Sequence, residues 1–216
     1  GLEIQENGAF TFEIIHDEVN LARVFLKIPG RHNALNALAA FAVGHFLGKP
    51  TKMIAAALGE FTGVDRRFDV RGETAGVVVV DDYAHHPTEI RATLSAARDR
   101  YSEHELWVVW QPHTYTRTNV YFKEFANSFQ AADHVIVTRT FAAREEIRSS
   151  EIEEKLVREM CHSDARFISE MDQVSDYLST HLNPGSVVMV LSAGDAQQIS
   201  SRVLEDLSRM AKTPDV

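Results

Sequence analysis

A run of four valines, Val77–Val80, passes directly into the polar segment Asp-Asp-Tyr-Ala-His-His at residues 81–86. An unbroken β-branched run is typical of a strand that is buried on both faces, as in a parallel sheet covered by helices. Pro87 then begins a segment whose apolar residues have helical spacing up to about residue 97. The order strand, polar turn and helix predicts a βα unit, in which ligands bind at the carboxyl end of the strand.

Three more apolar runs, at residues 106–110, 135–137 and 187–191, also end in polar segments. Helical patterns lie at residues 121–130, 152–160, 174–182 and 199–210. Strands that alternate with helices predict an α/β domain with a Rossmann-like, mostly parallel sheet and flanking helices. All four polar segments then lie along one edge of the sheet, so that residues over a hundred positions apart form one site.

The first part of the chain has a different pattern. Asn7-Gly8 predicts a hairpin turn between strands at residues 2–4 and 10–14, and residues 24–28 predict another strand. Helices are expected from about residue 32 to 47 and from 51 to 59. The βα pattern begins only after residues 63–68, which predicts two domains, 1–65 and 66–216.

Composition restricts the class of protein and of ligand. The 216 residues are 44% hydrophobic and 25% charged, and no apolar run approaches the roughly 20 residues of a membrane span. We therefore expect a cytoplasmic protein without membrane insertion, and a single cysteine excludes a disulfide framework or a cysteine zinc cage. The net charge of -9 argues against nucleic-acid binding. Arginines at the domain junction or at strand ends predict a small anionic ligand instead: Arg66, Arg67, Arg117, Arg139 and Arg144.

Three segments, Gly30–Leu38, Asp82–Glu89 and Gln111–Thr118, together with Gly63–Phe68 at the junction, resemble the Mur ligases of peptidoglycan and cell-wall synthesis. Within that family they are similar to the members that join L-alanine to UDP-N-acetylmuramate. The resemblance covers essentially the whole chain and implies an ADP-forming acid–amino-acid ligase. ATP would phosphorylate the muramate carboxylate, and the amine of L-alanine would then displace phosphate through a tetrahedral intermediate.

The resemblance also assigns the two predicted domains. Residues 1–65 would be the carboxyl-terminal part of the central ATP-binding domain, and residues 66–216 the amino-acid-binding domain. The P-loop pattern Gly-x-x-x-x-Gly-Lys-Ser/Thr does not occur in the chain. We therefore expect ATP and Mg²⁺ to be bound mainly by parts of the enzyme outside it, and the chain alone to be inactive. Gly1 in place of an initiator Met agrees with a fragment. The expected partners are small molecules, and the oligomeric state stays open.

Site residues are assigned position by position from the resemblance. His32, Asn33 and Asn36 correspond to the segment that meets adenine, although N-terminal helix capping explains the two asparagines equally well. Arg66 and Asp82 are expected to contact the nucleotide, Asp82 through the ribose. Four residues are expected to face L-alanine and the acyl phosphate: Tyr83, His85, His113 and Arg117. Arg66 and His85 are the predicted catalytic residues, and no metal ligand is predicted.

Two positions depart from the family pattern. Relatives often carry Arg where this chain has Thr114, so a cationic contact is either missing or supplied by another residue such as Arg144. Glycine is commoner than Ser192 in the last polar segment. Both departures concern substrate contacts.

The same sequence allows two other interpretations of function. A metal-dependent hydrolase could use residues 81, 82, 85, 86 and 113 as ligands, but neighbouring side chains of an extended segment point apart. A regulatory domain that only binds a nucleotide or a partner remains open, because the chain has no P-loop.

Overall fold

The computed structural model describes residues 2–5 and 8–212. The chain divides into two compact units, residues 1–64 with 95–102 and residues 65–94 with 103–216. Each unit has its own hydrophobic core.

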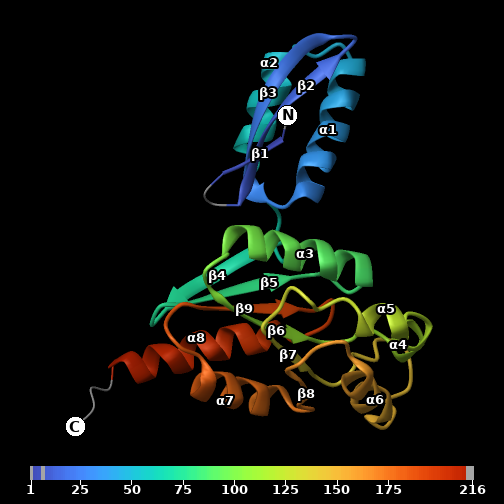
Figure 1. Cartoon of the computed structure of the whole chain (residues 1–216), viewed down its shortest axis with the longest axis vertical. Helices are drawn as coiled ribbons and strands as arrows, with labels where there is room; N and C mark the ends of the chain where they lie inside the picture. The colour runs from blue at the N-terminus through green and yellow to red at the C-terminus, as the bar shows by residue number, and fades with distance from the viewer. Residues whose placement is uncertain (1, 6–7, 213–216) are drawn as a thin grey trace. The chain divides into compact units, whose positions relative to one another are not determined.

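The first unit contains a three-stranded antiparallel sheet in the order β1-β2-β3 (Figure 1). Its strands are β1 (Leu2–Ile4), β2 (Ala9–His16) and β3 (Val19–Pro29), followed by the helices α1 (Arg31–Phe46) and α2 (Thr51–Glu60). The predicted strands and both helices are confirmed. Asn7 of the predicted hairpin turn lies outside the described residues, whereas Gly8 has the positive φ of 73° that glycine tolerates.

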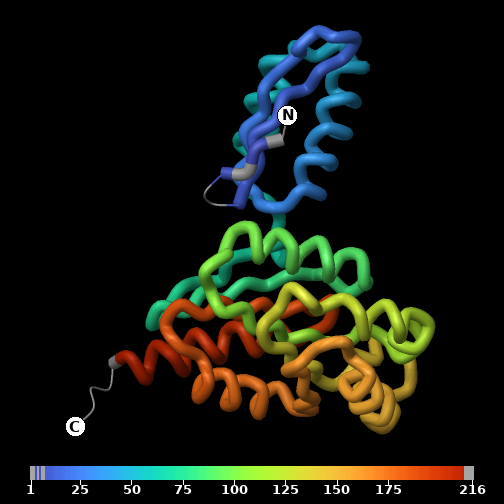
Figure 2. Tube along the Cα trace, viewed as in Figure 1, coloured from blue at the N-terminus to red at the C-terminus, as the bar shows by residue number. Residues whose placement is uncertain are grey.

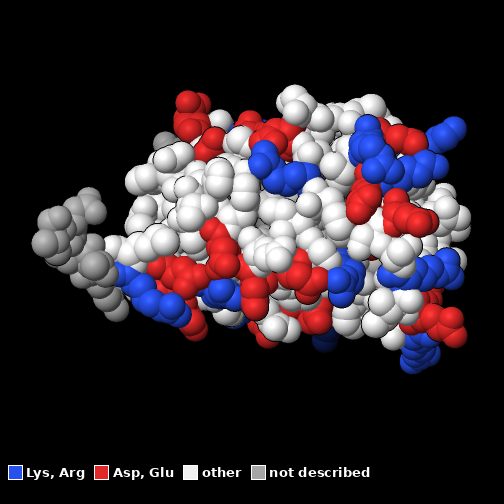
Figure 3. Space-filling model, turned by 90° about the horizontal axis from the view of Figure 1, so that it is seen from below, with Lys and Arg blue, Asp and Glu red and all other residues white. Residues whose placement is uncertain are grey.

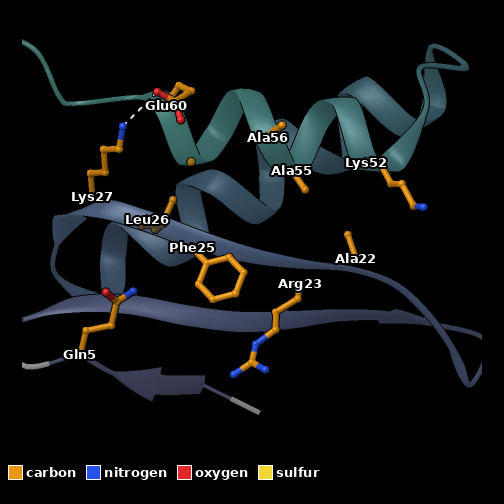
Figure 4. A pocket seen from close by; sticks show the side chains of 11 residues that line it. Gln5, Ala22, Arg23, Phe25, Leu26, Lys27, Lys52, Ala55, Ala56 and Glu60 are labelled. Atoms are coloured by element: carbon orange, nitrogen blue, oxygen red, sulfur yellow. Dashed lines mark hydrogen bonds and ion pairs between the residues drawn. The ribbon is translucent and has the colours of Figure 1, made fainter.

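A pocket of ≈ 620 Å³ lies between β3 and α2 (Figure 4). Figure 4 shows Lys27 of β3 next to Glu60 of α2, and Lys27 Nζ is 3.0 Å from Glu60 Oε2. None of the site residues predicted from the sequence lines this pocket. It is therefore not the predicted site.

The second unit contains a six-stranded sheet in the order β4-β5-β9-β6-β7-β8. Its strands are β4 (Asp69–Thr74), β5 (Val77–Asp82), β6 (Glu105–Trp110), β7 (His134–Val137), β8 (Ala165–Phe167) and β9 (Ser186–Leu191). All strands are parallel except β4, which pairs with β5 in antiparallel fashion. Figure 2 shows the red strand β9 between the green strands β5 and β6, which are much earlier in the chain. The predicted mostly parallel sheet is confirmed.

Neither edge strand was predicted. β4 has the polar sequence Asp-Val-Arg-Gly-Glu-Thr and its residues are exposed or half-buried, while β8 has only three residues. An edge strand is paired on one side only and its faces are less completely covered than those of central strands, so it needs no continuous apolar run. The pattern that reveals β5, β6, β7 and β9 is therefore missing at the edges.

The later helices of the chain are α3 (Pro87–Arg100), α4 (Tyr115–Val120), α5 (Phe122–Ala126), α6 (Glu151–Glu159), α7 (Met171–His181) and α8 (Gln197–Lys212). All of them belong to the second unit except the end of α3, from residue 95 on, which is counted with the first. On one sheet face, Trp107 and Val190 pack with Val174 of α7 and Val203 of α8. On the other face, the Trp110 ring lies 4.6 Å from that of Phe125 in α5. The alternating strand residues therefore fill two helix-covered layers.

The helix predicted over residues 121–130 is wrong in its extent. Two short helices, α4 and α5, meet at Tyr121, whose φ of -103° and ψ of 25° interrupt the helical path. The first begins inside the polar segment, because the Thr114 side chain accepts a hydrogen bond from the Arg117 backbone. This capping contact was not anticipated from the apolar spacing.

Ion pairs join α7 and α8 on the surface. Arg202 of α8 contacts Asp172 and Asp176 of α7 and also Asp206 in its own helix. On the face shown in Figure 3, basic and acidic side chains are interspersed in this way. That face does not present the single-sign surface that a polyanion would need.

Candidate functional site at the carboxyl edge of the sheet

The strand register places three polar segments at one level. Leu191 at the end of β9 pairs with Asp82 of β5 on one side and with Trp110 of β6 on the other. The residues that follow these three strands therefore begin side by side at the carboxyl edge. This arrangement confirms the predicted convergence of these segments.

Arg66 connects the junction to two of these segments. Its Nη2 donates to the carbonyl oxygens of Ser192 (2.6 Å) and Gly194 (3.0 Å), and its guanidinium carbon lies 4.9 Å from the Tyr83 ring centre. The Arg66 carbonyl accepts a hydrogen bond of 2.7 Å from the Tyr83 backbone. Arg66 and Phe68 have φ values of 59° and 51°, a left-handed conformation that costs about 1–2 kcal/mol per residue. Surrounding contacts therefore hold a strained junction in place.

Asp82 is one of those contacts. Its side chain is 5% exposed, and its oxygens accept hydrogen bonds from Phe68 N (2.8 Å), Ala84 N (2.7 Å) and Thr93 Oγ1 (3.3 Å). Burial raises the pKa of this carboxyl above its ordinary value, although the backbone hydrogen bonds oppose the rise. The carboxylate is thus directed towards the protein, where it ties the junction to the turn after β5. A ribose contact by Asp82 stays a prediction.

His85 has a defined hydrogen-bonding tautomer. Its Nδ1 lies 2.8 Å from the Tyr83 carbonyl oxygen, which can only accept, so Nδ1 donates. In the neutral ring, Nε2 then keeps its lone pair. The backbone N–H groups of His85 and His86 both donate to Glu89 Oε2, which fixes the turn at the start of α3. His85 therefore offers a fixed proton acceptor at this edge.

His113 has the opposite tautomer. Arg117 Nη1 lies 3.2 Å from His113 Nδ1, and because a guanidinium only donates, Nδ1 accepts and the neutral ring carries its proton on Nε2. Burial, and then the charge of Arg117, lower the pKa of His113. The rings of His85 and His113 are 5.7 Å apart, and the His85 and Tyr83 rings are 5.3 Å apart. The structure thus brings together the four residues predicted to face L-alanine.

Two residues that the sequence did not reveal support His113 and Arg117. Phe141 pairs with His113 in an isolated bridge, and its ring lies 5.6 Å from the His113 ring. Glu145 accepts hydrogen bonds from the backbone of Tyr115 and Thr116 in the first turn of α4. No local pattern marks these residues, because both act from the loop after β7, about thirty positions away in sequence.

The two departures from the family pattern have structural roles here. Thr114 has a φ of 67° and a ψ of 139°, which is unusual for a β-branched residue, and its hydroxyl caps α4. It therefore supplies no cationic contact, and Arg144 is exposed, next to Glu145. The Ser192 hydroxyl donates a hydrogen bond of 2.7 Å to Gln111 Oε1.

The predicted adenine segment lies in the first unit. Asn33 Nδ2 donates to the Pro29 carbonyl (2.7 Å), and Asn36 Nδ2 is 3.5 Å from Asn33 Oδ1, so the two asparagines share one helix face as predicted. Neither asparagine caps α1, because Gly30 occupies the N-cap position and no side chain makes a capping hydrogen bond there. His32 precedes them in the first turn and is half-buried.

Asp81 and Asp82 point in different directions, as expected for an extended segment. Asp81 contacts Ser200 of α8 and Arg71, whereas Asp82 contacts the junction and α3. Within residues 2–5 and 8–212, no group of three or more His, Cys, Asp or Glu side chains is arranged to hold a metal ion. In the same residues, no helix is long and apolar enough to cross a membrane.

Comparisons with known proteins agree with this fold. The sequence profile of the family described as "Mur ligase, glutamate ligase domain" matches residues 66–194. The chain is 40% identical over 209 residues to UDP-N-acetylmuramate--L-alanine ligase from Alkaliphilus metalliredigens, covering 95% of this chain and 45% of that protein. It is 42% identical over 202 residues to the ligase of the same name from Carboxydothermus hydrogenoformans, covering 93% and 43%.

Solved structures show the same relationship. The crystal structure of UDP-N-acetylmuramate-alanine ligase from Thermotoga maritima superposes with a TM-score of 0.78 at 28% identity, covering 94% of this chain and 44% of that one. A murein peptide ligase from Psychrobacter arcticus gives a TM-score of 0.69 at 26% identity, covering 97% and 43%. The chain belongs to the Mur ligase family. It spans about 45% of the length of the curated relatives it matches.

Proposed function

We propose that the chain is the carboxyl-terminal part of a cytoplasmic, ATP-dependent ligase that joins L-alanine to UDP-N-acetylmuramate. The observation that carries the proposal is the cluster of Tyr83, His85, His113 and Arg117 at the carboxyl edge. Relatives named for this reaction, at about 40% identity, support the choice of substrates.

In the proposed site, different residues bind negative charge and accept a proton. The Arg117 guanidinium and the Nε2–H of His113 are donors for the alanine carboxylate and for the oxyanion of the tetrahedral intermediate. Nε2 of His85 accepts the proton that the alanine ammonium must lose before its nitrogen can attack. The new C–N bond forms at the acyl carbon, the C–O bond to phosphate breaks, and phosphate leaves with the electron pair and takes up the second proton that the nitrogen loses as it becomes an amide.

Arg66 is proposed to contact the nucleotide phosphates. Two carbonyl oxygens occupy its Nη2, whereas Nη1 and Nε retain N–H groups that fit a phosphate. Bound ATP would supply the phosphoryl group that activates the muramate carboxylate. The described residues include no carboxylate cluster suited to Mg²⁺. Because the sequence also has no P-loop pattern, we assign Mg²⁺ and most ATP contacts to parts of the enzyme outside this chain.

We also propose that residues 1–65 are the end of the ATP-binding domain and residues 66–216 the amino-acid-binding domain. Residues 37–44 of helix α1 are all apolar or glycine, so this part of the helix has apolar side chains on all sides. Phe41 lies in the core of the first unit, whereas Val43 and Phe46 are 60% and 89% exposed. Helices of this kind are normally buried on every side, which fits a unit that belongs to a larger domain.

Phosphate release by the full-length polypeptide tests the proposal. We expect release to require ATP, UDP-N-acetylmuramate and L-alanine together, with the amide product detected by mass spectrometry. The 216-residue chain, assayed as the matched control, should release none. A full-length protein that binds nucleotide but forms no amide would support the regulatory alternative instead.

A further inference from the structure

Gln111, the first residue after β6, makes four hydrogen bonds with one buried side chain. Its exposed fraction is 2%, and its Oε1 accepts from Ser192 Oγ (2.7 Å), Asp195 N (3.1 Å) and Ala196 N (3.2 Å). Its Nε2 donates to Asp195 Oδ1 at 2.8 Å. All four bonds reach the turn between β9 and α8, residues 192–196, which we call the β9–α8 turn.

The β9–α8 turn is packed closely against Gln111. A Cβ atom at Gly194 would lie 2.5 Å from Gln111 Oε1 and 2.5 Å from Phe141 Cγ. The Gly194 N–H also donates to Ser192 Oγ at 2.9 Å. There is no space for a side chain at Gly194, so a shift of this turn is opposed on both sides.

The planarity of the peptide bond links Gln111 to Arg66. The Gly194 carbonyl and the Asp195 N–H belong to one planar group and point in opposite directions. Because the Asp195 N–H donates to Gln111, the Gly194 oxygen is turned towards the other side, where it accepts from Arg66 Nη2 at 3.0 Å. The Ser192 oxygen accepts from the same nitrogen at 2.6 Å. Gln111 thus fixes the Gly194 carbonyl, one of the two that accept from Arg66.

We infer that Gln111 is a positioning residue, which orients the Arg66 guanidinium towards a nucleotide phosphate through the β9–α8 turn. The inference rests on the proposed function, in which Arg66 contacts that phosphate. Gln111 suits this role because its uncharged amide can accept from the turn and donate to Asp195 at once. A carboxylate in its place would repel Asp195 and compete for the guanidinium.

A double-mutant cycle in the full-length ligase separates this role from simple support of the fold. We would measure kcat/KM for ATP in the wild type, in Gln111→Met, in Arg66→Ala and in the double variant. Gln111→Met should lower kcat/KM about tenfold, from the loss of buried hydrogen bonds. In the Arg66→Ala background the same substitution should have almost no further effect, because no guanidinium is left to position.

Thr138→Val is the matched control. Thr138 is 1% exposed at the end of β7, and its Oγ1 holds a different loop through the Ser169 carbonyl at 2.9 Å. The Thr138→Val substitution removes a buried hydrogen bond at the same edge without touching the β9–α8 turn. Its effect on kcat/KM for ATP should be small, and additive with Arg66→Ala.

The outcomes distinguish a failure of the proposed Arg66 contact from a failure of the Gln111 role. If Arg66→Ala itself leaves kcat/KM for ATP unchanged, the proposed nucleotide contact is wrong and the role of Gln111 fails with it. The other result is that Arg66→Ala lowers kcat/KM for ATP while Gln111→Met lowers it by the same factor with and without Arg66. In that case Gln111 serves the fold alone, and only this inference fails. Should Gln111→Met not fold, Ser192→Ala removes one of the same bonds and must show the same non-additivity.

Discussion

His85→Asn is the most direct test of the proposed proton acceptor. His85 Nδ1–H donates to the Tyr83 carbonyl over 2.8 Å, and an asparagine amide N–H can replace it and keep this hydrogen bond. It cannot replace the lone pair on Nε2. The substitution therefore removes the proposed chemistry while leaving the local fold in place.

The structure allows an estimate of both effects. General base catalysis contributes roughly 10²–10⁴-fold, so turnover of the full-length enzyme should fall by that factor, equivalent to about 3–5 kcal/mol. The half-buried ring loses little packing and keeps its hydrogen bond, so the free energy of unfolding should change by less than about 1 kcal/mol. Steady-state phosphate release and urea unfolding measure the two quantities.

His86→Asn is the matched control for this test. The His86 Nδ1 accepts a hydrogen bond of 3.3 Å from Thr88 N at the start of α3, and its ring packs against Tyr121. Asparagine is a good helix N-cap, so turnover and stability should both be retained. Near wild-type turnover in His85→Asn, or an equal loss in His86→Asn, would refute the assignment of the proton acceptor to His85.

Three further predictions concern other residues. Arg117→Ala in the full-length enzyme should raise KM for L-alanine at least about tenfold with little change in KM for ATP, because a charge-assisted contact is lost; equal changes in both constants would contradict the assignment. Asp82→Asn should lower the free energy of unfolding of the 216-residue chain by about 1–3 kcal/mol, since an amide N–H would face a donor, and urea titration without a shift would refute this. Burial alone would lower the pKa of His134, but hydrogen bonds to Asp164 and Glu105 raise it above 6.5 overall. The stabilisation is therefore complete below that value and is lost as pH rises through the raised pKa, so His134→Gln should destabilise the chain more at about pH 6 than at about pH 9 in urea unfolding.

The central strands and most helices could be read from local patterns. The valine run of β5 and the apolar runs of β6, β7 and β9 have both faces buried, so their composition is enough to predict a central position in the sheet. Strands β4 and β8 lack such an apolar run because they lie at the edges of the sheet. The helix at 121–130 was misplaced because Thr114 and Glu145 cap an earlier start that no periodicity marks.

The site was predictable as a set of residues but not as a geometry. The sequence shows that Tyr83, His85, His113 and Arg117 follow strands, and parallel strands necessarily bring such segments to one edge. The tautomers of His85 and His113 depend on which neighbour each Nδ1 meets, and only the folded chain shows these contacts. The protein-facing direction of Asp82 likewise depends on Phe68 and Thr93.

The sequence by itself determined that this chain is an α/β protein with a polar edge, because strand burial and helix periodicity are local properties of the residues. Only the tertiary structure decided that Gln111 serves the β9–α8 turn, over eighty positions away. Two of its four partners are the backbone N–H groups of Asp195 and Ala196, and because every residue except proline offers such a group, these two contacts cannot be read from the sequence. Long-range pairing is set by sheet order and register, which place β9 between β5 and β6.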